Sequence, residues 1–258
     1  MLTEEGPVAR AGLDAVAVKP TEHDLRRAAD LPVDTVNVDY EGRAAFPSRE
    51  ELAALADEKT VYATTPVRAD GFDPLGDDSR LPLPDRVRRV IVAGHPAYLD
   101  DEERARAVAP RVGAARERAP DAWVGTESVE RLALAAGGTQ YELLGRGTAR
   151  EVRALREAGY DEEVAVYAPV VLSDDEDAIL DAVGRYAARR APVQRALPDG
   201  APTDANASGR AREVLSQAVR DYALVGDGEA VKSRVDALRE AGVDVVVGYP
   251  ARGLDEFL

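Results

Sequence analysis

The sequence VDVVVGYP, at residues 243–250, is a short run of apolar, mostly β-branched residues that ends at a glycine, a tyrosine and a proline. Short apolar runs of this length are typical of strands buried on both faces, and their alternation with helices indicates a parallel sheet. Seven further runs share this pattern, and helix-like stretches follow most of them: DAVAVKP (14–20), TVNVDYEG (35–42), TVYATTP (60–66), RVIVAGHP (89–96), AWVGTES (122–128), QYELLGRG (140–147) and VAVYAP (164–169). The eight runs predict an α/β fold, a single (β/α)8 TIM barrel over residues 1–258, regular or irregular.

The composition excludes several classes of protein and of site. Apolar residues make up 45% of the chain, which is enough for a sizeable core and argues against disorder. Cysteine is absent, so disulfides and thiolate metal sites are excluded, and two histidines are too few for a multi-histidine zinc site. We therefore expect no bound metal. The net charge of −15 argues against a nucleic-acid partner, because phosphate contacts need clustered Lys and Arg.

The charge and the termini also indicate a cellular setting. No apolar stretch approaches the roughly 18 residues that a membrane-spanning helix needs. The N-terminal sequence MLTEEGPVAR is acidic where a secretory signal would be basic, so we expect a cytoplasmic protein without a membrane partner. Lysine is scarce (Lys19, Lys59 and Lys232) while Asp and Glu are abundant, as in halophilic proteins. Molar salt screens the self-repulsion of such an acidic surface, and an ordinary acidic protein is the alternative.

Capping signals mark the helices between the strands. Ser48 with Glu51, and Thr148 with Glu151, have the spacing of a capping box, so each pair predicts a helix start. Two segments interrupt the alternation. Residues 68–86 are long and rich in Pro and Gly, which is typical of a lid over a site or of a solvated acidic loop. Residues 197–210 are expected to form a flexible loop between two helices.

In a (β/α)8 barrel the active site lies at the C-terminal ends of the strands. His95 follows a strand and precedes a proline, so it could act as a general base or have only a structural hydrogen bond. Asp39 and Glu41 are two residues apart, so both would point to the same face of an extended strand. Paired carboxylates can divide acid and base work or hold a divalent cation, and they can equally pair with basic neighbours. These three residues are the candidate catalytic groups.

The remaining polar residues of the strand ends are candidates for ligand contacts. Lys19 could be a nucleophilic lysine of a Schiff-base lyase, and the alternative is an ion pair with Asp39 or Glu41. The segments GRGT (145–148) and VGDGEAV (225–231) place glycines before helix starts, where amides can bind a phosphate or simply allow tight turns. Arg146 and Arg252 could hold an anion. We expect substrate contacts from Lys19, Glu127, Tyr167, Tyr249 and Arg252.

The last third of the chain resembles a known superfamily. Residues 164–192 and 222–253 are similar to the C-terminal part of luciferase-like proteins, which include flavin-dependent monooxygenases and deazaflavin-dependent oxidoreductases. The match rests on Val225-Gly226-Asp227, Glu229, Val231 and the stretch from Leu238 to Val243. The resemblance implies a (β/α)8 fold, a small-molecule ligand, FMN or a deazaflavin in the barrel mouth, and a homodimer.

The resemblance also implies which residues would contact the cofactor. The cofactor ring would lie near Asp39, His95 and the end of the third predicted strand. The cofactor phosphate would bind at a glycine turn. The implied cofactor contacts are Thr64, Thr65, Arg68, Gly145, Arg146, Gly147, Gly226 and Gly228. The second strand ends in Asp39-Tyr40, whereas Asp-His is common in the superfamily. A degenerate barrel without cofactor or turnover, which binds a ligand or has a structural role, is therefore the alternative function.

Overall fold

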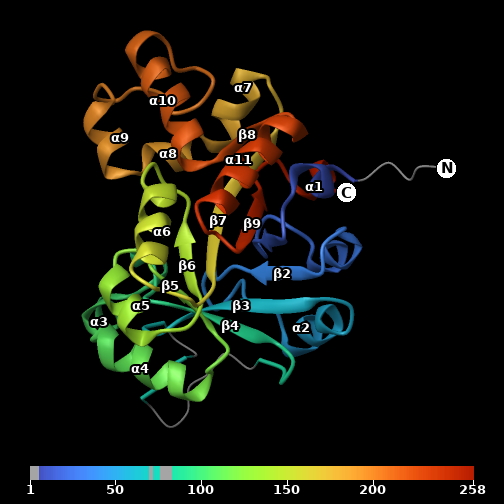
Figure 1. Ribbon diagram of the computed structural model, residues 1–258, viewed down its shortest axis with the longest axis vertical. Coiled ribbons are helices and arrows are strands. Elements are labelled where there is room, and N and C mark those ends of the chain that lie inside the picture. The colour runs from blue at the N-terminus through green and yellow to red at the C-terminus, as the bar shows by residue number, and fades with distance from the viewer. Residues whose placement is uncertain (1–5, 70–71, 76–82) are drawn as a thin grey trace, which may run out of the picture.

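Eight parallel strands close into a ring in the order β1-β2-β3-β4-β5-β6-β7-β9, with β9 pairing with β1 (Figure 1). The computed structural model describes residues 6–69, 72–75 and 83–258. The predicted single-domain (β/α)8 barrel is confirmed, and each predicted run overlaps one strand of the ring. The ring strands are β1 (Ala15–Val18), β2 (Thr35–Val38), β3 (Thr60–Pro66), β4 (Arg88–Val92), β5 (Trp123–Gly125), β6 (Gln140–Leu143), β7 (Val164–Leu172) and β9 (Val245–Pro250).

A ninth strand, β8 (Leu224–Gly226), lies outside the ring. It pairs with the last three residues of β7, where Val170 also pairs with Pro250 of β9. Since a strand has only two edges, β8 occupies the edge of β7 that β6 occupies nearer its start. The sequence pattern did not predict β8, because its last residues, Val225 and Gly226, are interpreted in the sequence as part of the glycine-containing segment before the next helix.

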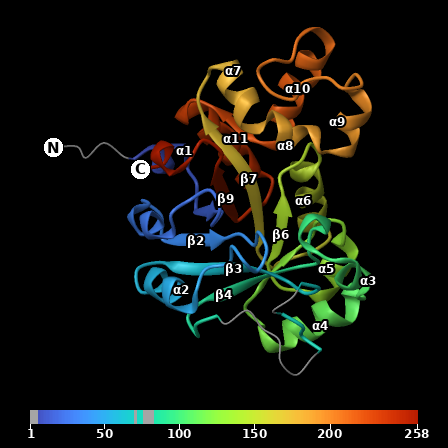
Figure 2. The same ribbon diagram turned by 180° about the vertical axis from the view of Figure 1, so that it is seen from behind.

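Helices surround the barrel, and four of them gather beside β8 and α11 at one end of the molecule (Figures 1 and 2). These four, α7 to α10, pack around their own apolar core, which includes Val171, Leu180 and Leu215. The helices are α1 (Pro7–Ala11), α2 (Arg49–Ala56), α3 (Asp101–Ala105), α4 (Val108–Arg118), α5 (Glu130–Ala136), α6 (Thr148–Glu157), α7 (Glu176–Ile179), α8 (Arg185–Ala188), α9 (Ala191–Ala196), α10 (Gly209–Tyr222) and α11 (Gly228–Glu240), with a π-helical turn at Leu180–Gly184 and 3-10 turns at Leu25–Asp30, Pro96–Tyr98 and Leu254–Glu256. No described helix is long and apolar enough to cross a membrane.

One of the two predicted capping boxes is present and the other is not. The Ser48 hydroxyl accepts a hydrogen bond from the Glu51 amide at 3.2 Å, and the Glu51 carboxylate accepts one from the Ser48 amide at 2.9 Å. Thr148, in contrast, is the first residue of α6 and not its N-cap. Its hydroxyl accepts a hydrogen bond from the Gly145 amide at 2.9 Å, so the side chain is used to fix the loop before the helix.

The two predicted loops differ in how much of them the structure describes. Within 68–86, residues 70–71 and 76–82 lie outside the described residues, so the expected lid cannot be placed. Residues 197–208 run between α9 and α10 and pack against the π-helical turn. There the Ala205 amide donates to the Asp181 carboxylate at 2.9 Å. A side chain added at Gly184 would lie 2.5 Å from the Thr203 carbonyl oxygen.

Aromatic side chains fill much of the barrel interior, where branched aliphatic residues are usual. Alternation along β3, β5, β6 and β7 turns Tyr62, Trp123, Tyr141 and Tyr167 inward, together with small residues of β1. Tyr62 stacks on Trp123 with 3.9 Å between ring centroids, and Trp123 stacks on Tyr141 at 5.5 Å. The interior below the mouth is therefore a packed core, and open space begins only above Tyr141.

Candidate functional site

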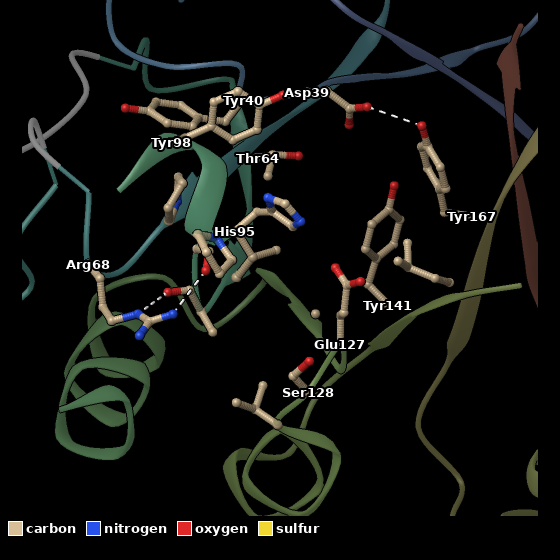
Figure 3. Close-up of a pocket in the computed structure, with 18 of the residues that line it drawn as sticks. Asp39, Tyr40, Thr64, Arg68, His95, Tyr98, Glu127, Ser128, Tyr141 and Tyr167 are labelled. Carbon is tan, nitrogen blue, oxygen red and sulfur yellow. Dashed lines mark hydrogen bonds between the residues drawn. The ribbon is translucent and has the colours of Figure 1, made fainter. Parts of the chain in front are cut away.

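A cavity of about 680 Å³ opens at the C-terminal ends of the strands, which is the size of a small-molecule site. Residues from the ends of β2 to β7 line it (Figure 3), and Tyr186 of α8 completes the lining. Aromatic rings and apolar side chains form most of its walls, and a few polar groups lie among them. The polar and aromatic residues of the lining are Asp39, Tyr40, Thr64, Arg68, His95, Tyr98, Glu127, Ser128, Tyr141, Tyr167 and Tyr186.

Asp39 is an acid of the cavity lining whose pKa is shifted from its usual value. It directly follows β2, where its carboxylate accepts hydrogen bonds from the Asn37 amide at 3.0 Å and from the Tyr167 hydroxyl at 3.3 Å. Loss of hydration raises the pKa of Asp39 to about 7, and the nearby charge of Glu41 also raises it. The charge of Lys19 and the Tyr167 hydrogen bond act in the opposite direction but are outweighed. Asp39 can therefore exchange a proton near neutral pH.

Two polar atoms near Asp39 are buried without a hydrogen-bond partner among the described residues. They are the side-chain oxygen of Asn37 and the hydroxyl oxygen of Thr64. The Asn37 amide nitrogen already donates to Tyr141 at 3.1 Å as well as to Asp39. Because unpaired buried polar atoms are costly, the Thr64 hydroxyl at the cavity wall indicates a place where a ligand group could bind.

His95 lies opposite Tyr141, with its ring directed into the cavity (Figure 3). It is the N-cap of the Pro96–Tyr98 turn, and its Nδ1 accepts a hydrogen bond from the Ala97 amide at 3.1 Å. In the neutral ring the proton is consequently on Nε2, which leaves that nitrogen as a donor toward the cavity. The structural hydrogen bond and a role in the site are compatible, because they use different nitrogens.

Glu127 and Ser128 form the turn between β5 and α5. The Glu127 carboxylate pairs with Arg190 at 3.5 Å. Ser128 has a φ of 63°, and it is the one described residue other than glycine in the left-handed region. Such a conformation costs a serine of order 1 kcal/mol, and strain of this kind is common in functional sites. Both side chains line the cavity (Figure 3).

Arg68 lines the cavity but directs its guanidinium group at the chain itself. It donates to the carbonyl oxygens of Ala93 at 2.7 Å, Gly94 at 2.9 Å and Arg104 at 3.2 Å. Five donors in a planar fork suit this role, since one side chain then fixes the loop after β4 that carries His95. Arg68 thus supports the site, and three of its five donors are engaged before any ligand binds.

Lys19, Glu41 and Tyr249 lie beside the cavity and not in its lining. The Lys19 ammonium pairs with Glu22 at 3.2 Å and lies 3.9 Å from the centre of the Tyr249 ring, whose hydroxyl donates to Glu22. The ion pair predicted for Lys19 is present, but the predicted partners, Asp39 and Glu41, were wrong. Because β2 ends at Val38, Asp39 and Glu41 do not share a strand face, and Glu41 instead accepts a hydrogen bond from the Thr21 hydroxyl at 2.6 Å.

The other predicted contacts lie away from the cavity lining. Thr65 points to the outer side of β3, where its hydroxyl donates to Ala63 at 3.0 Å. Gly145, Arg146 and Gly147 precede α6, at the end of β6, and Arg146 is exposed. Gly226 and Gly228 flank Asp227, the N-cap of α11. Gly228 lines a second hollow with Arg10, Asp227, Glu229 and Glu256, and Arg252 pairs with Glu256 at 3.0 Å.

The sequence pattern did not predict several residues of the site. Tyr141 of the lining and Asn37, which donates to Asp39 and Tyr141, occur within apolar runs, and counting alternate positions back from Asp39 and Leu143 would have placed both inside the barrel. Tyr40 follows the end of β2 by two residues, and Tyr98 follows the end of β4 by six. Tyr186 comes from a helix after the π-helical turn, and no local signal marks it.

Comparison with known proteins gives a family without a function. No curated protein matches the chain. Residues 8–257 match a family of unknown function, DUF7388, so the match includes every strand of the ring and every residue of the mouth cavity. The chain therefore belongs to the DUF7388 family.

Proposed function

We propose that the protein is a luciferase-like oxidoreductase that binds the ring of a flavin or deazaflavin in the mouth cavity. The observation that carries this proposal is the cavity itself: an aromatic-walled space with an acid that titrates near pH 7 and an unpartnered hydroxyl at Thr64. Flat heteroaromatic rings stack on such walls, and a few fixed polar groups orient them. The resemblance of the last third of the chain supplies the identity of the ring.

The residues present fit the ring better than the phosphate of such a cofactor. Tyr141 offers a face for stacking, and the Thr64 hydroxyl and the His95 Nε2 offer polar contacts. The described lining contains no lysine, and its one arginine, Arg68, is engaged by carbonyl oxygens. A phosphate would therefore bind outside the cavity, and the exposed Arg146 before α6 is our candidate for it.

When bound, a flavin or deazaflavin supplies the hydride chemistry. The chain supplies orientation and proton transfer. Asp39 can donate or accept a proton at a ligand atom near neutral pH, while Glu41 acts only through its charge, which favours the protonated form of Asp39. His95 offers a second proton donor from the opposite wall, and the tyrosine rings exclude water between them.

A non-catalytic ligand-binding barrel is the second candidate. It is favoured by the way in which the cations around the mouth are used: Lys19 pairs with Glu22, Arg190 with Glu127, and Arg68 with backbone carbonyls. Such internal pairing is expected of a degenerate site. The open cavity at Asp39, Arg68 and His95 counts against a blocked mouth, so a degenerate barrel would still bind a ligand.

Cofactor titration tests the proposal directly. The purified protein in molar KCl is titrated with FMN and with a deazaflavin, and binding is followed by the absorbance and emission of the cofactor. Thr64→Val should weaken binding about tenfold, whereas Thr65→Val, whose side chain faces away from the cavity, should leave affinity unchanged. Absence of binding at about 50 μM of either cofactor would refute the proposal.

The composition and the resemblance also suggest the conditions and the assembly in which the protein works. We infer a halophilic, cytoplasmic protein that forms a homodimer, as luciferase-like proteins often do. The acidic surface supports the first point, since its net charge of −15 needs screening by salt. Sedimentation in about 2 M and about 0.1 M KCl should show a folded dimer in the first and a loss of compactness in the second.

A further inference from the structure

The aromatic rings of the cavity form two groups with Asp39 between them (Figure 3). In the first group Tyr98 meets Tyr40 edge-on, with 6.5 Å between centroids and 88° between planes, and His95 lies 6.0 Å from Tyr98. In the second group Tyr141 meets Tyr167 at 6.2 Å and 66°. Rings at steep angles to each other present both faces and edges to the space they enclose.

The charged groups of the cavity favour a positive ligand. The carboxylate of Asp39 faces the space without a salt bridge among the described residues, the charge of Glu127 is balanced by Arg190 at 3.5 Å, and the guanidinium of Arg68 is bound to three carbonyl oxygens. Tyr141 and Tyr167 remain neutral phenols, because burial raises the pKa of each well above its usual value. An anionic ligand group would meet carboxylates and ring faces, which both carry negative potential.

The rim beside the cavity already contains an ammonium ion bound in this way. The Lys19 ammonium lies on the face of Tyr249, and that ring donates its hydroxyl proton to Glu22, which is the ion-pair partner of Lys19. Tyr167 stacks nearly parallel on Tyr249, at 6.3 Å and 14°, and donates its hydroxyl proton to Asp39. The two tyrosine–carboxylate pairs are therefore alike, and no Lys or Arg of the described residues lies over the Tyr167 ring.

We propose that the mouth cavity binds a small organic ammonium ion, with its charge between the two groups of rings and near Asp39. Ring faces attract such cations, and desolvation strengthens the attraction. Apolar substituents of the ammonium would contact Pro66, Val92 and Leu143, which complete the walls. This inference rests on the proposed function only in using the same cavity, where the ammonium compound would be the substrate.

Choline and its uncharged carbon analogue 3,3-dimethylbutan-1-ol test the inference, because they have the same shape and differ in charge. Calorimetric titration of the cofactor-free protein in KCl at pH 8.5, where Asp39 is ionised, should give at least about tenfold tighter binding of choline. Asp39→Asn should remove most of this preference. Asp57→Asn, which removes an exposed carboxylate near the end of α2, should leave it intact.

The ring contribution is tested at Tyr98, which is 44% exposed and can be changed without opening the core. Tyr98→Phe keeps the ring and should retain binding of choline, whereas Tyr98→Leu should weaken it about fivefold. Equal affinities for choline and the alcohol, or equal effects of the two Tyr98 variants, would overturn the inference. FMN titrations of the same samples separate the two proposals, since FMN binding without a preference for choline rejects only the ammonium ligand.

Discussion

Replacement of Asp39 by asparagine should stabilise the protein, and the gain should grow with pH. In the folded protein the pKa of Asp39 is raised from 3.8 to about 7, mainly by loss of hydration. At a pH below 3.8 the carboxyl is neutral in both the folded and the unfolded chain, so it causes no penalty. As the pH rises from 3.8 to about 7 the unfolded chain ionises while the folded carboxyl is still protonated, so stability falls, and above 7 the full penalty remains.

The size of this gain in stability follows from the pKa shift of Asp39. A difference of about 3 pKa units corresponds to at most about 4 kcal/mol at a pH above 7. The side chain is partly open to the cavity, and water there screens its charge, so we expect about 2 kcal/mol. Asparagine retains the shape of the side chain and can still pair with Asn37 and Tyr167, so little packing is lost.

Urea unfolding followed by circular dichroism, in molar KCl at pH 5 and pH 8.5, measures this gain. Asp39→Asn should raise the free energy of unfolding more at pH 8.5 than at pH 5. The charged neighbours of Asp39, Glu41 and Lys19, are present in both proteins, so most of their effects cancel in the difference. A gain that is the same at both pH values, or a loss at pH 8.5, would refute the account of Asp39 as a poorly hydrated acid.

Four further substitutions test local features of the fold by the same unfolding measurement. Ser48→Ala removes the capping box of α2 and should cost about 1 kcal/mol without changing ligand binding; an unchanged stability would contradict the cap. Gly184→Ala places a methyl group 2.5 Å from the Thr203 carbonyl oxygen and should cost about 2 kcal/mol, whereas Gly113→Ala, in α4 with open space around it, should gain about 0.5 kcal/mol. Ser128→Gly relieves the left-handed backbone and should gain about 1 kcal/mol; a loss would mean that the serine side chain has a stabilising contact.

The sequence was sufficient for the ring of strands because each strand is buried on both faces. Val36, Val61 and Val246 face the helices while Ala17 and Val247 face the interior, so apolar residues follow one another without a polar face. No such run of apolar residues predicted the π-helical turn or β8. Thr148 has the spacing of a capping box with Glu151, but its hydroxyl accepts a hydrogen bond from the loop before α6 instead. The sequence alone does not predict which of the two contacts forms.

The candidate site was predictable as far as strand ends determine it. Asp39, His95, Glu127 and Thr64 were expected at the mouth and line the cavity. Thr65 could have been excluded from the sequence alone, because adjacent residues of a strand point to opposite faces. The partners of Lys19 and Arg68 could not be predicted, because these partners lie mostly in loops whose path at the rim of the barrel has no sequence pattern.

The stacked interior gives the protein an optical reporter of its own site. Trp123 is the one tryptophan in the sequence, and it lies between Tyr62 and Tyr141, of which Tyr141 forms the floor of the cavity. Its fluorescence therefore originates from a single known place, one ring below the bound ligand. A change in its emission on ligand addition would report contact with Tyr141, and a red shift with loss of structure would report entry of water into the barrel.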